Sequence, residues 1–202
     1  MSEKKDKRII IAISGATGAI YAERLIKFVL EHHFHVDLII SKFALYMIQT
    51  ELDMDSKIDF TEHLNKKYNY SPENVEIHSN SNLASSLASG TRSSFGMVVV
   101  PCSMKTLSGI ANGYSSNLIE RAADVSLKEN QPLVLVPRET PLSLIHIKNM
   151  LYAKEAGANI VPAMPAFYPK PKNFDDVADF IVSRILKLLN IPNDLVSPWE
   201  EK

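Results

Sequence analysis

The chain has 202 residues, of which 46% are hydrophobic and 22% are charged, and its formal net charge is −1. This length and composition predict one globular domain with a full core and argue against a disordered chain. The near-neutral charge argues against nucleic acid or an anionic membrane as a partner, and no apolar run approaches the ~20 residues that span a bilayer.

The N-terminus and the cysteine content predict a cytoplasmic protein. Residues 1–8 are polar and charged, without the apolar core of a signal peptide. Cys102 is the single cysteine, so no intrachain disulfide can form, which fits a reducing compartment. No linker or repeat divides the chain, so we expect residues 1–202 to form one domain, with a core at about 8–190 and a tail at 191–202.

The first 81 residues predict two strand-and-helix units followed by an irregular segment. In chain order the elements are a strand at 9–13, a tight loop at 14–18, a helix from Ala19, a strand at 36–40 and a helix at 43–51. Both strands are largely apolar runs, typical of strands that are buried on both faces. Ser41 stands where the N-cap of the second helix belongs. Residues 53–81 are polar and weakly patterned, with a short strand at 75–77.

The rest of the chain continues the alternation. In chain order the elements are a strand at 96–101, helices at 104–111 and 117–129, a strand at 133–136, a helix at 141–156, a strand at 159–161 and a helix at about 174–190. Asn117 and Glu120 have the spacing of a capping box, and Pro141 is acceptable in a first turn. Strands that alternate with helices predict an α/β fold with a central parallel sheet and helices on both faces.

Small and polar residues follow the predicted strands, at 14–18, Ser41, 102–106 and 137–139. Because ligands of open α/β sheets bind beyond the carboxyl ends of the strands, these residues predict a binding edge. The loop at 14–18 leads into a helix N-terminus, where free N–H groups suit an anion, although a plain turn is an equal alternative. Its glycines lack the dinucleotide spacing and it has no P-loop lysine, so NAD and ATP are poor candidates.

The C-terminal helix carries a cation in its predicted buried stripe. Arg184 lies seven residues after Val177, among apolar residues at helical spacing. A buried cation needs a partner, so Arg184 predicts an anion site, with a snorkelling arginine as the alternative. The loop at 165–169 is apolar and stiffened by prolines, which predicts a lid or pocket wall, with packing onto the sheet as the alternative.

Two further features predict structure rather than chemistry. His32, His33 and His35 lie at a helix end, where imidazoles are commonly solvated, and we expect no metal there. Cys102 has no histidine near it in sequence, so we expect a buried structural thiol rather than a nucleophile.

Six motifs stand in order along the chain: SGATGA at 14–19, SK at 41–42, PCSMKTL at 101–107, NLIERAAD at 117–124, LVPRETP at 135–141 and PAFY at 165–168. Together they resemble the UbiX-type flavin prenyltransferases, a flavoprotein family related to the FMN-dependent cysteine decarboxylases. The resemblance extends from about Arg8 to Trp199 and is weakest at 53–81.

The resemblance implies a fold, an assembly and a reaction. The fold is a Rossmann-like or flavodoxin-like three-layer structure, and the assembly is a homododecamer. Reduced FMN is alkylated at N5 and C6 by dimethylallyl monophosphate, without a metal, and the prenylated FMN serves a UbiD-type decarboxylase. The residues alone do not separate a monophosphate from a diphosphate donor.

The resemblance also implies roles for individual residues. FMN would contact Gly15, Ala16, Thr17, Ser41, Ser103, Met104, Lys105, Thr106 and Arg138. The substrate would contact Tyr168, Arg184, Lys128, Arg121, Ser89, Gly90 and Trp199, partly across subunits. The catalytic positions would be Ser14, Thr17, Glu51 and Glu139, with Glu139 moving a proton. Thr17 stands where many relatives have serine, and its β-branch restricts the rotamer of the hydroxyl.

Three other functions stay open at this stage. An FMN-dependent cysteine decarboxylase would carry a Pro-Ala-Ser-Ala-Asn-Thr type motif, whereas residues 101–106 here read PCSMKT, without asparagine. A direct aromatic acid decarboxylase would release carbon dioxide without a partner. A non-catalytic carrier would bind FMN and leave dimethylallyl monophosphate unchanged.

Overall fold

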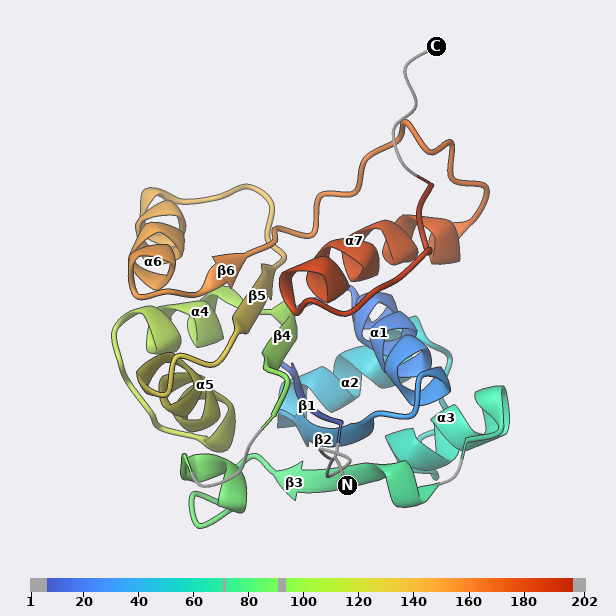
Figure 1. The fold of residues 1–202 in the computed structure, drawn as a ribbon, viewed down its shortest axis with the longest axis horizontal. Helices are drawn as coiled ribbons and strands as arrows, with labels where there is room; N and C mark the ends of the chain where they lie inside the picture. The colour runs from blue at the N-terminus through green and yellow to red at the C-terminus, as the bar shows by residue number, and fades with distance from the viewer. Residues whose placement is uncertain (1–6, 71, 91–93, 198–202) are drawn as a thin grey trace, which may run out of the picture.

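A computed structural model describes residues 7–70, 72–90 and 94–197 of the chain. At its centre is a six-stranded sheet whose neighbouring strands are all parallel (Figure 1). The strands are β1 (Arg8–Ile13), β2 (His35–Ile40), β3 (Val75–Ser79), β4 (Met97–Cys102), β5 (Leu133–Pro137) and β6 (Asn159–Ile160). The predicted α/β fold with a central parallel sheet is therefore confirmed.

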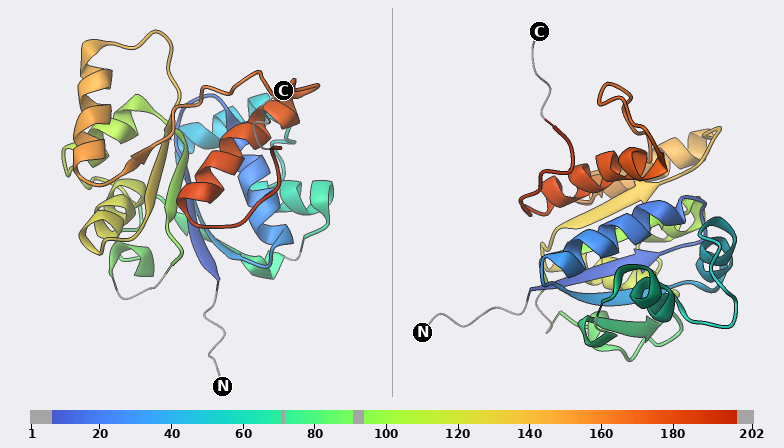
Figure 2. Two further views of the ribbon diagram at one scale, coloured as in Figure 1. Left: turned by 45° about the horizontal axis from the view of Figure 1, so that its top comes forward. Right: turned by 90° about the vertical axis from the view of Figure 1, so that its right-hand side faces the viewer.

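Helices cover both faces of the sheet (Figure 2). One core contains residues of α1 (Ala19–Glu31), α2 (Lys42–Glu51), α3 (Phe60–Tyr68) and α7 (Phe174–Leu188). The other contains residues of α4 (Met104–Ala111), α5 (Leu118–Lys128) and α6 (Leu144–Glu155). Across the described ranges, none of the helices combines the length and the apolar character that a membrane span requires.

Successive residues of the central strands belong to different cores. On β1, Ile9 and Ile11 pack in the core that contains α1 and α7, whereas Ile10 and Ala12 pack in the core that contains α4 and α5. Neighbouring side chains of a strand point to opposite faces, so a strand covered on both faces must be apolar at nearly every position. This explains why the predicted strands appear as continuous apolar runs.

The strand order places the ligand edge. The strands lie in the order β3-β2-β1-β4-β5-β6, which is the Rossmann order rather than the flavodoxin order. The direction of winding reverses between β1 and β4, which pair directly through Ile10 with Met97 and Ala12 with Val99. A sheet of this kind leaves a crevice beyond the carboxyl ends of the two strands at the reversal, and ligands bind there.

The segment at 53–81 is more regular than predicted, because it contains α3 as well as β3. Asp59 is the N-cap of α3 and accepts a hydrogen bond from the Glu62 N–H. Phe60 and Leu64 are each 1% exposed, and they are the buried residues of this helix. Two apolar anchors in nine polar-rich residues are too few to give a detectable helical period.

The helix predicted from residue 141 begins later. Pro141 lies in the loop before α6, and Ser143 supplies the N-cap, so the helix begins at Leu144. Leu144, Ile147 and Leu151 are exposed on this helix. Part of the apolar surface of α6 is therefore exposed rather than packed against the sheet.

Candidate active site

A cleft with two lobes lies at the carboxyl edge of the sheet. The Arg138 lobe, of about 210 Å³, is lined by residues that include Ala16, Thr17, Arg138 and Glu139. The Ser41 lobe, of about 320 Å³, is lined by residues that include Ser41, Lys105, Thr106 and Asn117. The two lobes adjoin, because Gly15, Phe43 and Ser103 line both. All nine residues predicted as flavin contacts line one lobe or the other: Gly15, Ala16, Thr17, Ser41, Ser103, Met104, Lys105, Thr106 and Arg138.

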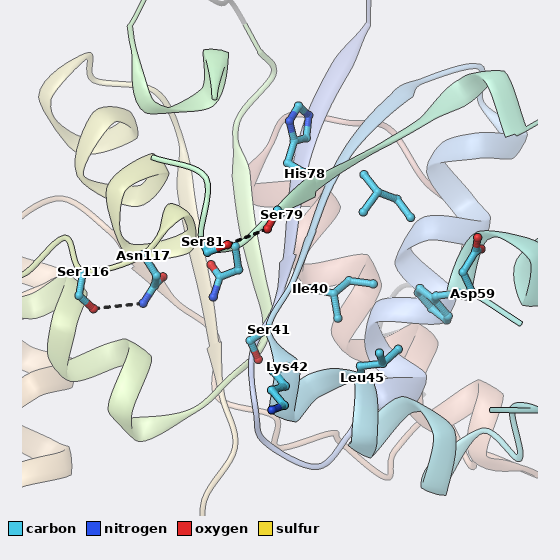
Figure 3. A pocket seen from close by; sticks show the side chains of 13 residues that line it. Ile40, Ser41, Lys42, Leu45, Asp59, His78, Ser79, Ser81, Ser116 and Asn117 are labelled. Carbon is cyan, nitrogen blue, oxygen red and sulfur yellow. Dashed lines mark hydrogen bonds between the residues drawn. The ribbon is translucent and has the colours of Figure 1, made fainter. Parts of the chain in front are cut away.

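Three helices begin at the Ser41 lobe. Ser41, Ser103 and Asn117 are the N-caps of α2, α4 and α5, and each side chain accepts a hydrogen bond from a backbone N–H of its own helix. Figure 3 shows Ser41 at the start of α2 and Asn117 at the start of α5. A helix N-terminus carries partial positive charge, so three of them around one cavity favour an anion. With Lys105 on the same wall, the lobe suits a phosphate group.

The Arg138 lobe holds a buried donor that lacks a partner in the described part of the chain. The Nε atom of Arg138 is buried and makes no hydrogen bond to any described residue. A buried N–H left unpaired costs about 1–3 kcal/mol, so this atom indicates an acceptor that comes from a ligand. Arg138 also acts on its surroundings: burial raises the pKa of Tyr21, and the nearby guanidinium opposes that rise.

Ser14 connects the ends of β1 and β4 instead of facing the cleft. Its hydroxyl donates to the Pro101 carbonyl at 3.0 Å and accepts from the Ser103 N–H at 2.7 Å, and the residue is buried. The Ser14 hydroxyl therefore already acts both as a donor and as an acceptor toward other residues of the chain. Ser14 therefore holds Ser103, which connects β4 to α4, in place, and the catalytic role expected for Ser14 stays a prediction.

Glu51 closes the N-terminus of α1. The N-cap residue of this helix is Gly18, which has no side chain to cap it. One carboxylate oxygen of Glu51 accepts hydrogen bonds from the N–H groups of Gly18 and Ala19, both at 2.8 Å. The expectation that these N–H groups are free for an anionic ligand is therefore wrong, because a carboxylate of the chain already binds them.

Gly15 lies where the two lobes meet. A Cβ atom at this position would lie 2.9 Å from the Cβ of Phe43, which is closer than real Cβ contacts allow. Glycine is therefore needed to let the exposed Phe43 side chain lie against the loop. Phe43 and Met47, one turn apart on α2, give the Arg138 lobe an apolar wall.

Five lining residues were not predicted as site residues from the sequence: Phe43, Met47, Asn80, Asn117 and Ile119. Asn80 follows β3, and its carbonyl and side-chain oxygens accept the Leu118 and Ile119 N–H groups at 2.8 and 3.1 Å. The sequence did not predict Asn80 as a site residue because it lies in the weakly patterned segment at 53–81. Asn117 was predicted only as a helix N-cap. A larger cavity of about 580 Å³ borders the Ser41 lobe through Ser41, Asn80 and Asn117 (Figure 3).

Arg184 lies beside the buried stripe of α7 rather than within it. The buried residues of this helix are Ala178, Ile181, Val182, Ile185 and Leu186, and Arg184 itself is exposed. Its guanidinium lies 4.9 Å from the centre of the Phe180 ring and donates to the Tyr168 hydroxyl at 3.3 Å. Arg184, Tyr168 and Lys187 line a cavity of about 370 Å³. The prediction of a buried cation is wrong, but Arg184 and Tyr168 do meet.

The other predicted substrate residues lie elsewhere. Ser89, Gly90, Arg121 and Lys128 belong to α5 and the loop beside it, on the opposite face of the sheet from α7. Arg121 donates to the Ala88 carbonyl at 3.3 Å and to Asp124 at 2.7 Å. Within one chain, these four residues therefore lie away from Arg184. Trp199 lies outside the described residues.

Two groups with possible chemistry have structural partners. Asp37, Glu76 and His78 lie close enough to hold a metal ion, but Arg8 already places a cation 3.1 Å from Asp37 and 3.6 Å from Glu76. Cys102 is fully buried, and this burial raises the pKa of its thiol to about 12. Neither a metal ion at the acidic cluster nor a thiolate at Cys102 is therefore favoured.

Comparison with known proteins gives a consistent result. The sequence model of the flavoprotein family matches residues 1–186. Flavin prenyltransferase UbiX of Methanocaldococcus jannaschii is 46% identical over 95% of this chain and 98% of its own length. The crystal structure of AnUbiX (PadA1) in complex with FMN and dimethylallyl pyrophosphate is similar with a TM-score of 0.87, at 37% identity, over 98% of this chain and 100% of that one. The crystal structure of a dodecameric FMN-dependent Ubix-like decarboxylase from Escherichia coli O157:H7 is similar with a TM-score of 0.84, at 36% identity, over 96% of this chain and 100% of that one.

Proposed function

Because this chain belongs to the flavoprotein family, and within it to the flavin prenyltransferases, we propose that its cleft holds reduced FMN beside a dimethylallyl phosphate and transfers the dimethylallyl group. The chain is thus an alkyl-transferring enzyme, and its flavin is FMN. Two observations carry the assignment to this cleft. At one end the Arg138 Nε has no hydrogen-bond partner among the described residues, and at the other end three helix N-termini meet.

The cleft fits FMN by the chemistry of its two lobes. The caps Ser41 and Ser103, together with the ammonium of Lys105, suit a phosphate in the Ser41 lobe. The Nε of Arg138 suits an acceptor atom on the polar edge of a flavin ring, and Phe43 offers apolar surface beside it. We therefore assign the phosphate of FMN to the Ser41 lobe and its ring to the Arg138 lobe.

Reduced FMN, when bound, supplies an electron-rich ring whose N5 and C6 are the atoms to be alkylated. The chain must stabilise the leaving phosphate, because negative charge grows there as the allylic C–O bond breaks. Arg184, Lys187 and the Tyr168 hydroxyl line one cavity and offer two cations and a donor for this purpose. Orientation of two reactants contributes up to roughly 7–11 kcal/mol in ideal cases, which such a clamp helps to supply.

A second copy of the chain completes this phosphate site in our proposal. Arg121, Lys128 and the Ser89–Gly90 loop lie on the other face of the sheet, so a partner subunit must bring its own set to Arg184. The exposed apolar residues of α6 support association between copies. The Escherichia coli relative is dodecameric, and we propose the same assembly here.

Glu139 is the carboxylate placed to move a proton. Its Oε1 accepts the Thr140 N–H at 2.9 Å, which leaves Oε2 for proton transfer at the Arg138 lobe, where Thr17 also lies. For Ser14 and Glu51 we propose positioning roles, since their side chains hold the β4–α4 loop and the N-terminus of α1. We also propose that the enzyme is cytoplasmic and that a UbiD-type decarboxylase receives its product.

One experiment tests the proposal. The protein is incubated without oxygen with reduced FMN and either dimethylallyl monophosphate or the diphosphate, and the flavin is then weighed by mass spectrometry. We expect a flavin heavier by one dimethylallyl group, with the monophosphate as the preferred donor. Unchanged flavin with both donors contradicts the proposal and leaves a flavin carrier.

Two decarboxylase controls complete the test. The purified protein is incubated with a cysteine-containing peptide and, separately, with a hydroxybenzoate, and carbon dioxide is measured. Release from either substrate without a partner protein favours a decarboxylase over the transferase.

A further inference from the structure

Glu120 is a buried carboxylate that the proposed reaction does not use. It lies in the first turn of α5, and its side chain is 1% exposed. Oε2 accepts the Ser116 N–H at 2.9 Å and the Ser116 hydroxyl at 2.6 Å, and Oε1 accepts from the Lys105 ammonium at 3.1 Å. This carboxylate therefore connects the start of α5 to the flavin cleft, because Lys105 lines the Ser41 lobe.

The side chain is turned away from the position that its sequence predicts. A capping box would place the Glu120 carboxylate on the N–H of the N-cap residue Asn117. Half of the box forms, since the Asn117 side chain accepts the Glu120 N–H at 3.1 Å. The carboxylate instead binds Ser116 and Lys105, on the side of α4.

Packing and hydrogen bonds hold the carboxylate in one place as an anion. A Cβ atom at Gly109 of α4 would lie 2.8 Å from the Cδ of Glu120, so α4 packs directly on the carboxyl group. Burial by itself raises the pKa of Glu120, but the hydrogen bonds from Ser116 and Lys105 outweigh it and leave the pKa below its ordinary value. Lys105 thus faces a fixed negative charge.

Lys105 needs such an anchor. Its side chain is 76% exposed, and a lysine that is free in solvent loses much rotamer entropy when it binds a ligand. An ordinary surface ion pair would restrain it little, because both side chains move. Here the acidic partner is buried and held by Ser116, so one carboxylate oxygen confines the ammonium beside the lobe.

We propose that Glu120 is a positioning residue, which holds the ammonium of Lys105 at the Ser41 lobe so that it binds the phosphate of FMN. This inference rests on the proposed function, because it assumes that the lobe takes a phosphate. An ammonium has three donors, so it can bind Glu120 and a phosphate at the same time.

The test compares the effect of Lys105→Met on FMN affinity in two backgrounds. Affinity is measured from the quenching of flavin fluorescence. In the otherwise unchanged protein, Lys105→Met should weaken FMN binding about tenfold, as expected for a lost charged hydrogen bond. In Glu120→Gln protein the same change should weaken binding about threefold or less, because an unanchored lysine contributes less. An equal or larger loss in the Glu120→Gln background overturns the proposal.

Ser116→Ala provides the matched control. It removes the hydroxyl hydrogen bond to the same carboxylate but keeps the backbone N–H bond that holds it, and it does not touch Lys105. It should therefore lower the melting temperature while Lys105→Met keeps its tenfold effect. If the Lys105 effect shrinks equally in Ser116→Ala and Glu120→Gln protein, loosening of the start of α5 explains both and the proposal fails. Absence of FMN binding by the unchanged protein contradicts the proposed function itself, whereas normal binding with an unchanged Lys105 effect contradicts only the role of Glu120.

Discussion

Replacement of Arg138 by methionine should stabilise the flavin-free protein and weaken its binding of FMN. The Nε of Arg138 is buried without a hydrogen-bond partner among the described residues. An unpaired buried donor costs about 1–3 kcal/mol, and methionine fills similar space without an N–H group. The substitution therefore removes a cost from the folded state, while it also removes a donor that the ligand needs.

The magnitude follows from these costs. In a domain of this size, 1 kcal/mol shifts the melting temperature by about 2–4 °C, so a gain of about 1–2 kcal/mol should make the flavin-free variant melt about 2–8 °C higher. This uses the lower half of the range, because the remainder of Arg138 is partly exposed. Loss of a hydrogen bond from a charged donor costs about 1.5–3 kcal/mol, so FMN binding should weaken about 10- to 100-fold.

The assay combines thermal unfolding of flavin-free protein with titration of FMN. Arg24→Met is the matched control, because Arg24 on α1 pairs with Asp179 on α7 at 2.6 Å, away from the cleft. That variant should melt at a lower temperature and bind FMN as before. If Arg138→Met also melts lower, Arg138 serves the fold and our reasoning is refuted. A more stable variant with unchanged FMN affinity would refute the ligand role alone.

Three further predictions concern the cleft and the core. Arg184→Ala should abolish prenyl transfer and leave FMN bound, as judged by product mass and by flavin absorbance; product at the unchanged rate contradicts the phosphate clamp. Glu51→Ala should lower stability by about 1 kcal/mol in urea unfolding, because α1 loses its cap; an unchanged midpoint refutes the capping role. Burial raises the pKa of Cys102 from 9.0 to about 12, so the unfolded thiol ionises first and stability should fall as pH rises between these values, by about 1.4 kcal/mol per unit. Cys102→Ala should lack this alkaline component, and equal pH slopes for the two proteins contradict it.

Local sequence patterns were enough to predict most elements. The apolar run at 9–13 and the Ser41 cap both correspond to what the structure contains, because run length and cap chemistry involve neighbouring residues. The same reasoning predicted that the small and polar residues after the strands form a binding edge. Most of these residues line the cleft because the carboxyl ends of parallel strands share one edge.

Local patterns failed where a neighbouring element decides the outcome. A helical stripe identifies an apolar side only to within one residue position, and packing against α1 turned α7 so that Ala178 and Val182 are buried and Arg184 is exposed. In α3 the burial of Phe60 and Leu64 depends on the core formed by other segments. The periodicity of apolar residues in the sequence therefore predicted neither the exposure of Arg184 nor the presence of α3.

The sequence by itself determined the alternation of strands and helices, the covering of the sheet on both faces, and most of the small and polar residues that line the cleft. All of these depend on residue types within a few positions of one another. Only the tertiary structure decided that β1 lies beside β4, that Glu51 caps α1, and that Glu120 holds Lys105. Each of these contacts joins segments far apart in the chain, and their distance is set by how complete elements pack together.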